Sequence, residues 1–186
     1  RNKKTDQVHI MVGVRSYART HKDKTIVSLL GAVLGSGSSS RLFERLREDM
    51  GAGYYVSAGN SSYTDHGFMA IRTGTSPDRV EEVITAIMEE MKRLTTDLVP
   101  DAELAKVKEY VIGNATMALE SSDEWADFFS TQYVLGGPVQ TFAQQLAEFK
   151  KITPKDLLRV ARKIFTDKGL NCAIIGPVEK SKKLAN

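Results

Sequence analysis

Hydrophobic and polar residues alternate in the first strongly patterned segment of the chain, residues 8–14, which read VHIMVGV. Successive side chains of a strand point to opposite faces, so a period of two predicts a strand with one buried face. His9 falls on the other face, where it is a candidate for the wall of a cleft. The aliphatic residues at alternate positions are Val8, Ile10, Val12 and Val14.

The pattern then changes to a helical one. From about Lys22 to Leu34, apolar residues recur at spacings of three and one, which gives one apolar stripe along a helix. A run of glycine and serine at 35–40 ends this helix. A second helix restarts near Ser40 and continues to Met50, with Gly51 well placed to stop it.

Strands and a long helical block follow. Residues 53–62 and 67–74 read as two strands joined by a short polar turn, which predicts an antiparallel hairpin. Beyond residue 75 the chain is almost wholly helical until a last strand, LNCAIIG, at 170–176. This order predicts an α+β fold, a two-layer sandwich of an antiparallel or mixed sheet with helices on one face.

Two groups of residues are expected in the core on the strength of their neighbours. Cys172 stands in the apolar run of the last strand, where a small buried thiol is typical. Trp125, Phe128 and Phe129 have the spacing of one helix face and are expected to pack inside the domain.

Composition narrows the possible classes of protein. With 186 residues, 41% of them hydrophobic, the chain suits a single domain spanning 1–186. The net charge is only +3 and both signs are intermixed, so nucleic-acid binding is not expected. No apolar run approaches the roughly 20 residues of a membrane span, and no signal peptide opens the chain. A start at Arg1 suggests a fragment or a processed chain, and the compartment is left undetermined.

The glycine–serine run at 35–40 has three possible roles: a flexible tether, a phosphate cradle, or a shaped turn inside one domain. A dinucleotide fingerprint needs a third glycine where Ser40 stands and a preceding strand, and a P-loop needs a lysine that is absent here. Amphipathic helices on both sides argue against a tether. A tight connection between two helices is therefore favoured, in which glycine permits unusual backbone angles.

Residues 34–59, LGSGSSSRLFERLREDMGAGYYVSAG, resemble a hallmark stretch of the insulinase/pitrilysin family of zinc metallopeptidases, which includes the mitochondrial processing peptidases. The family pattern is a Gly-rich turn, Ser-Ser-Arg-Leu-Phe, Leu-Arg-Glu, and Gly-Leu-Ala-Tyr before a strand. The chain departs from it at Ala52, Gly53 and Tyr55. The predicted order of elements also follows the C-terminal half-domain of that family over nearly the whole chain.

This resemblance implies specific roles. In the family, zinc is held by a His-x-x-Glu-His helix of a separate N-terminal half-domain, and the C-terminal half supplies an Arg and a Tyr seven residues apart. By position these are Arg47 and Tyr54. They would hydrogen-bond a substrate carbonyl and the oxyanion that develops on it. The substrate-binding turn would comprise Gly35, Gly37, Ser39 and Ser40.

The zinc motif itself is absent from the chain. None of the three histidines, His9, His21 and His66, is followed by a ligand or a glutamate at the required spacing, and the last two stand among turn formers. We therefore assign no metal ligand here and expect zinc in the partner N-terminal half, whether fused or a separate chain.

The sequence leaves three hypotheses for the function, each a different class of protein. The favoured one is the substrate-side half of a zinc-dependent metalloendopeptidase, which binds an extended peptide and is inert by itself. The alternative is a catalytically silent homologue that serves as a scaffold or a peptide-presenting subunit. A nucleotide-binding domain is the third, and we do not expect tight nucleotide binding at 35–40.

Overall fold

A four-stranded antiparallel sheet forms one layer of the structure, a computed structural model that describes residues 1–3 and 5–177. The strands are β1 (Val8–Ser16), β2 (Tyr55–Ser62), β3 (Gly67–Thr75) and β4 (Leu170–Ile175). Their order across the sheet is β2-β3-β1-β4. The first and last strands of the described chain are therefore neighbours, and β2 and β4 are the edges.

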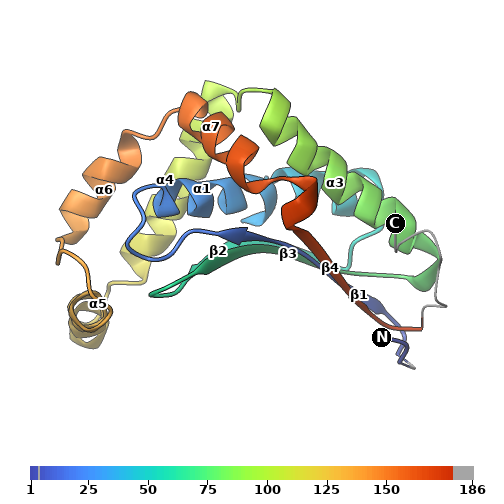
Figure 1. Ribbon diagram of the computed structural model, residues 1–186, viewed down its shortest axis with the longest axis horizontal. Helices are drawn as coiled ribbons and strands as arrows, with labels where there is room; N and C mark the ends of the chain where they lie inside the picture. The colour runs from blue at the N-terminus through green and yellow to red at the C-terminus, as the bar shows by residue number, and fades with distance from the viewer. Residues whose placement is uncertain (4, 178–186) are drawn as a thin grey trace.

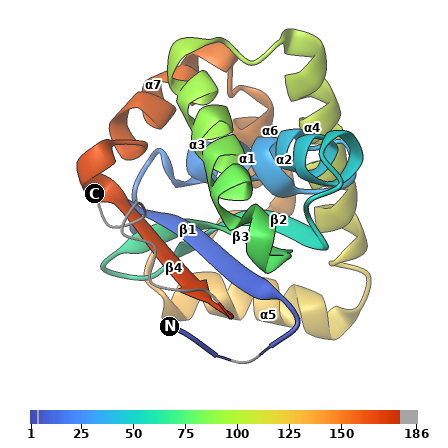
Figure 2. The same ribbon diagram turned by 90° about the vertical axis from the view of Figure 1, so that its right-hand side faces the viewer.

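Helices form the second layer. Figures 1 and 2 show α1, α3 and α7 crossing the same face of the sheet, while α5 lies beyond the end of the sheet. Two short 3-10 turns, Pro77–Arg79 and Asp167–Gly169, lead into α3 and β4. The α-helices are α1 (Lys24–Gly35), α2 (Arg41–Phe43), α3 (Val80–Thr96), α4 (Asp101–Met117), α5 (Ser122–Val134), α6 (Phe142–Lys150) and α7 (Pro154–Ile164).

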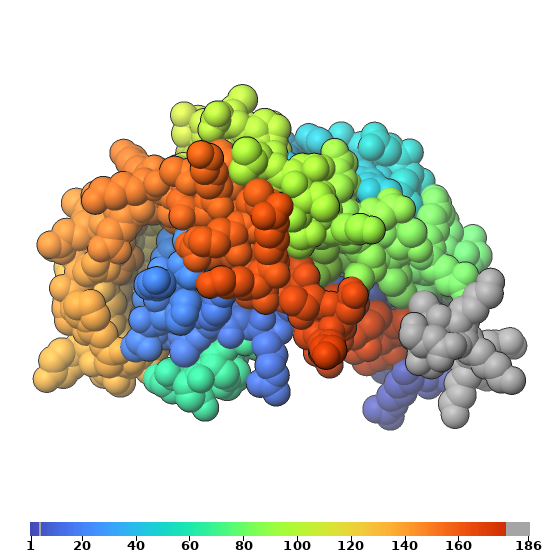
Figure 3. Space-filling view, turned by 45° about the horizontal axis from the view of Figure 1, so that its top comes forward, coloured from blue at the N-terminus to red at the C-terminus, as the bar shows by residue number. Residues whose placement is uncertain are grey.

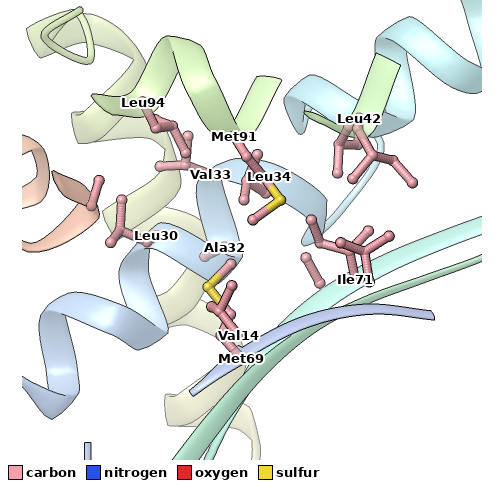
Figure 4. Packing of buried hydrophobic residues seen from close by; sticks show 14 of the residues in the cluster. Val14, Leu30, Ala32, Val33, Leu34, Leu42, Met69, Ile71, Met91 and Leu94 are labelled. Atoms are coloured by element: carbon pink, nitrogen blue, oxygen red, sulfur yellow. The ribbon is translucent and has the colours of Figure 1, made fainter. Parts of the chain in front are cut away.

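Aliphatic side chains fill the space between the two layers (Figure 4). Every residue of α1 from Leu29 to Gly35 is buried, because this helix lies between the sheet and the helices α2, α4 and α7. Its approach to β2 is very close. A Cβ on Gly35 would lie 2.4 Å from the main-chain nitrogen of Ala58, far inside van der Waals contact.

A buried ion pair ties the start of α1 to α7. Asp23 is almost fully buried and accepts two hydrogen bonds of 2.9 Å from the guanidinium of Arg159. The hydrogen bonds from Arg159 lower the pKa of Asp23 below its ordinary value. The pair joins residues that are 136 positions apart in the sequence.

The predicted fold class is confirmed: an antiparallel sheet carries helices on one face, and the described residues beyond 75 are helical up to the last strand. Among these residues, none of the helices combines the length and apolar character needed to cross a bilayer.

Two expectations about the core were wrong. Cys172 is exposed, because it lies on the edge strand β4, beyond the cover of the helices. Trp125 and Phe129 are also exposed, at 36% and 38%, because α5 projects past the sheet (Figure 1). With Phe128 and Phe142 they form a separate aromatic cluster instead of joining the main core.

Candidate functional site

Arg47 lies on a π-helical segment, Glu44–Asp49, that continues directly from α2. The sequence pattern predicted an ordinary α-helix here, but the amide of Met50 donates to the carbonyl of Arg45, five residues back. Single π-helical turns are rare and often mark functional sites.

The guanidinium of Arg47 is directed at the strand that follows. Its Nη1 donates a 2.7 Å hydrogen bond to the carbonyl oxygen of Tyr54, and its Cζ lies 5.6 Å from the centre of the Phe43 ring. The predicted alignment of residues 43 and 47 on one side of the helix is thus observed. Arg47 remains exposed, and its other N–H donors make no hydrogen bond to the described residues.

Tyr54 is positioned by a tight turn between the helix and β2. Gly51 takes φ +59, in the left-handed region that glycine adopts without strain. The main-chain nitrogen of Tyr54 donates to the carbonyl of Gly74 at 2.9 Å, while its phenol is 53% exposed. The structure therefore brings Arg47 and Tyr54 together at the start of an edge strand, with both side chains open to solvent.

Tyr55 and His9 form a second polar contact next to this point, on the sheet face that carries no helix. The phenol oxygen of Tyr55 lies 3.0 Å from Nδ1 of His9. Both residues pair with Gly74 in the ladder between them, and a Cβ on Gly74 would lie 2.6 Å from the Tyr55 ring. The absence of a side chain at Gly74 therefore allows the ring to cross β3.

The alternation of residues 8–14 predicts that His9 lies on this open face, but it does not predict the contact with Tyr55. Tyr55 was noted only as a departure from the family pattern. Gly74 is the available signal, since a glycine inside a strand often marks a place where another group approaches closely.

The glycine–serine turn separates into buried and accessible positions. Gly35 is buried under β2, and Ser40 is buried with its hydroxyl donating to the carbonyl of Gly37 at 2.7 Å. Gly37 is half-buried with φ +85, and a Cβ there would lie 3.1 Å from the Tyr110 ring of α4. Ser39 is exposed. Of the four predicted substrate-binding residues, Ser39 and Gly37 are the ones a ligand can reach.

A network of ion pairs fixes the helix between the turn and Arg47. Arg41 donates to both carboxylate oxygens of Glu103 on α4, at 2.7 and 2.8 Å, and this bond raises its pKa further. Arg45 pairs with Glu89 and Glu90 on α3. Glu90 is only 3% exposed, and its Oε2 has no hydrogen-bond partner among the described residues. These contacts hold the Arg47 backbone against two helices.

The described residues contain no group of three His, Cys, Asp or Glu side chains arranged to hold a metal ion. The ring of His66 contacts Asp65 in the β2–β3 turn, and His21 accepts a hydrogen bond from the amide of Asp23. The donor set for zinc is thus not found in this part of the chain.

Comparison with known proteins shows the family of the chain. The family described as "Peptidase M16 inactive domain" matches residues 1–111, more than half of the chain. The chain belongs to the peptidase M16 inactive-domain family. An uncharacterized zinc protease of Bacillus subtilis, YmxG, is 30% identical to it over 167 residues, which are 90% of this chain and 41% of YmxG.

Two solved structures share the fold of this M16 domain. A protease from Helicobacter pylori superposes with a TM-score of 0.85 at 24% identity, over 94% of this chain and 42% of that one. A peptidase M16 inactive domain from Pseudomonas fluorescens gives 0.86 at 19% identity, over 97% of this chain and 43% of that one. The chain spans about two fifths of the length of these relatives.

Proposed function

We propose that this M16 domain is the substrate-side half of a zinc-dependent metalloendopeptidase, and that Arg47 and Tyr54 meet the scissile peptide bond. The observation that carries the proposal is their convergence. Arg47 and Tyr54 are seven positions apart and lie together between the π-helix and β2. The guanidinium of Arg47 donates a hydrogen bond to the carbonyl of Tyr54, and both side chains are exposed.

The chemistry of the pair suits acyl transfer. A guanidinium carries five N–H donors, and Arg47 uses one of them on the main-chain carbonyl of Tyr54. The remaining donors and the phenol O–H of Tyr54 supply hydrogen bonds to a carbonyl oxygen that gains negative charge. Because the ion pairs around Arg41 and Arg45 fix the helix, these donors need little reorganisation.

The edge position of β2 supports an extended peptide as substrate. Within the described residues, β2 pairs with β3 on one side and with no strand on the other. Unpaired main-chain groups at a sheet edge are a template for adding a strand, a common way of binding peptides. Tyr54 directly precedes this edge, so a bound peptide would pass Arg47.

Zinc would come from the N-terminal half that accompanies this domain in full-length relatives. Bound there, zinc polarises a carbonyl and activates water. The share of this chain is to bind and orient the peptide and to donate hydrogen bonds from Arg47 and Tyr54. Ser39 and the rim of Gly37 add accessible polar surface at the other end of the helix.

The test is peptidase activity of the full-length zinc-bearing protein, or of this chain with its zinc-bearing partner, on a quenched unstructured peptide. We expect a chelator to abolish cleavage. Arg47→Ala and Tyr54→Phe should each lower kcat/KM by about 10²-fold, the loss typical of one oxyanion donor. Substrate binding should weaken much less, because the donors act on developing charge.

Matched controls separate chemistry from folding. Arg162→Ala removes another exposed arginine that donates to a backbone carbonyl, that of Thr95 at 2.9 Å. Tyr63→Phe removes the hydroxyl of a tyrosine that is 51% exposed in the β2–β3 turn. Both should stay within about twofold of wild type. If the intact assembly binds peptide but cleaves nothing, the scaffold hypothesis replaces this one. If Arg47→Ala and Tyr54→Phe cleave normally, the proposed roles of Arg47 and Tyr54 are refuted.

A further inference from the structure

A pocket opens at the far end of β2 from Arg47, where four elements meet. Its wall is formed by the start of α1, the last residues of β2, and the facing sides of α4 and α6. Figure 3 shows this side of the molecule, with the blue residues at the start of α1 next to the orange residues of α6. Eight residues of strand separate Tyr54 from Ser62 at the pocket, roughly 25 Å in extended form.

Two cations line this pocket without an ion pair. Arg19 and Lys24 both face it, and neither forms a salt bridge or a side-chain hydrogen bond with the described residues. Partial desolvation of the ammonium and the charge of Arg19 lower the pKa of Lys24, while Glu148 opposes the shift. Glu148 already accepts a hydrogen bond from Gln140 at 2.8 Å. The nearby Asp23 is bound by Arg159. The lining thus holds two cations and one carboxylate, that of Glu148, which leaves a net charge of +1.

Two amide side chains of the pocket form hydrogen bonds within the fold. Asn60 bonds to Ser16 and Ser62, and Gln145 donates to Gln132. The apolar part of the wall comes from α4 and α6. It consists of Val111, Ile112, Ala115, Phe142, Leu146 and Phe149. The pocket thus presents two cations without an ion pair, one carboxylate and an apolar surface.

We infer that this pocket binds the C-terminal residue of a peptide, with its carboxylate at Arg19 and Lys24 and an apolar side chain against α4 and α6. A C-terminal Leu or Phe carries both features within one residue. The inference rests on the proposed function only in taking a peptide as the ligand. It adds that roughly eight residues lie between the anchored C-terminus and the bond held at Arg47.

The experiment is direct binding of a fluorescein-labelled decapeptide ending in Leu, measured by anisotropy. It uses the full-length protein, or this chain with its partner, in chelator so that no cleavage occurs. The same peptide with an amidated C-terminus is the comparison. We expect amidation to weaken binding about tenfold. Lys24→Met should weaken binding of the acid by a similar factor, and Arg19→Met combined with Lys24→Met should make acid and amide bind equally.

The variants are chosen to leave the fold intact. Lys24 is exposed and is the first residue of α1. Because the N-terminal end of a helix carries a positive partial charge, loss of a positive side chain there does not destabilise the helix. Lys22→Met is the matched control, because Lys22 is exposed in the same loop but does not line the pocket. It should discriminate acid from amide as wild type does.

Equal binding of acid and amide to wild type would overturn the inference. Octanoate that displaces the peptide from the pocket with equal affinity would also overturn it, since it would assign the pocket to small carboxylates. Arg47→Ala should keep the preference for the acid. If Arg47→Ala cleaves normally and the preference for the acid is present, the proposed function fails and the pocket inference stands. If Arg47→Ala loses cleavage but wild type binds acid and amide equally, the pocket inference alone fails.

Discussion

Replacing Gly35 by alanine tests how closely α1 lies against the sheet. The added Cβ would lie 2.4 Å from the nitrogen of Ala58, 2.8 Å from its Cβ and 2.9 Å from the carbonyl carbon of Ser57. Carbon atoms in contact prefer about 3.5 Å. Either the end of α1 or the middle of β2 must therefore move by roughly 1 Å. Both are main chain, so no side chain can swing aside.

The cost follows from this geometry. Overpacking a core typically costs about 1–3 kcal/mol, and three close contacts with a rigid strand put Gly35→Ala at the upper end. Alanine gains little helix propensity here, because Gly35 is the last residue of α1. We expect a loss of about 3 kcal/mol in the free energy of unfolding. For a chain of this size that corresponds to a fall in Tm of roughly 6–12 °C.

The assay is urea denaturation followed by far-UV circular dichroism, with a second glycine as control. Gly113 lies in the exposed middle of α4, and a Cβ there would meet nothing within 4 Å. Gly113→Ala should gain up to about 1 kcal/mol from helix propensity alone. If Gly35→Ala unfolds at the same urea concentration as wild type, the close packing of α1 on β2 is refuted as the reason for glycine at 35.

The remaining predictions concern the Asp23 ion pair and the open sheet face. Arg159→Met leaves the buried Asp23 charge unpaired; because the side chain of Arg159 is 41% exposed, we expect a loss of about 2 kcal/mol at pH 7, below the usual cost of breaking a fully buried pair. The pKa of Asp23 is lowered in the folded state, so its stabilisation is present above the unfolded pKa of about 3.9 and is lost as the pH falls through the folded value. Urea titrations of wild type and variant should therefore converge as the pH falls through the lowered pKa of Asp23, and a difference that does not shrink with falling pH would contradict this account. Gly74→Ala places a Cβ 2.6 Å from the exposed Tyr55 ring, which should swing away and break its contact with His9 at a cost below about 1 kcal/mol. A His9 ring resonance that is unchanged by NMR would show that Gly74 does not set this contact.

The local pattern of hydrophobic and polar residues predicts most of the helices and strands. The alternation at residues 8–14 marked β1, and its buried side chains are those on the predicted face. What the sequence could not show depends on tertiary geometry. The π-helix around Arg47 has the same apolar spacing as an α-helix, so periodicity alone does not reveal the extra residue in its turn.

For the candidate site, too, the sequence indicates which residues take part but not how they contact one another. Family resemblance and spacing pointed to Arg47 and Tyr54, but neither predicts that the guanidinium bonds to the Tyr54 carbonyl. For Trp125, the sequence pattern predicts a position that the structure contradicts. Its helical spacing with two phenylalanines predicted a core position, whereas the position of α5 relative to the sheet is set by long-range packing that a local pattern does not contain.

The strand order has a consequence for synthesis of the protein. β1 pairs with β3 on one side and with β4 on the other, and β4 is made more than 150 residues later. While the ribosome is still translating the helical block, one edge of β1 has no partner, and its row of valine and isoleucine side chains lacks the full cover of α7. Such an edge can recruit other nascent chains. Closure of the sheet is thus a late, long-range event, which favours slow folding and a need for chaperone protection until the final strand is available.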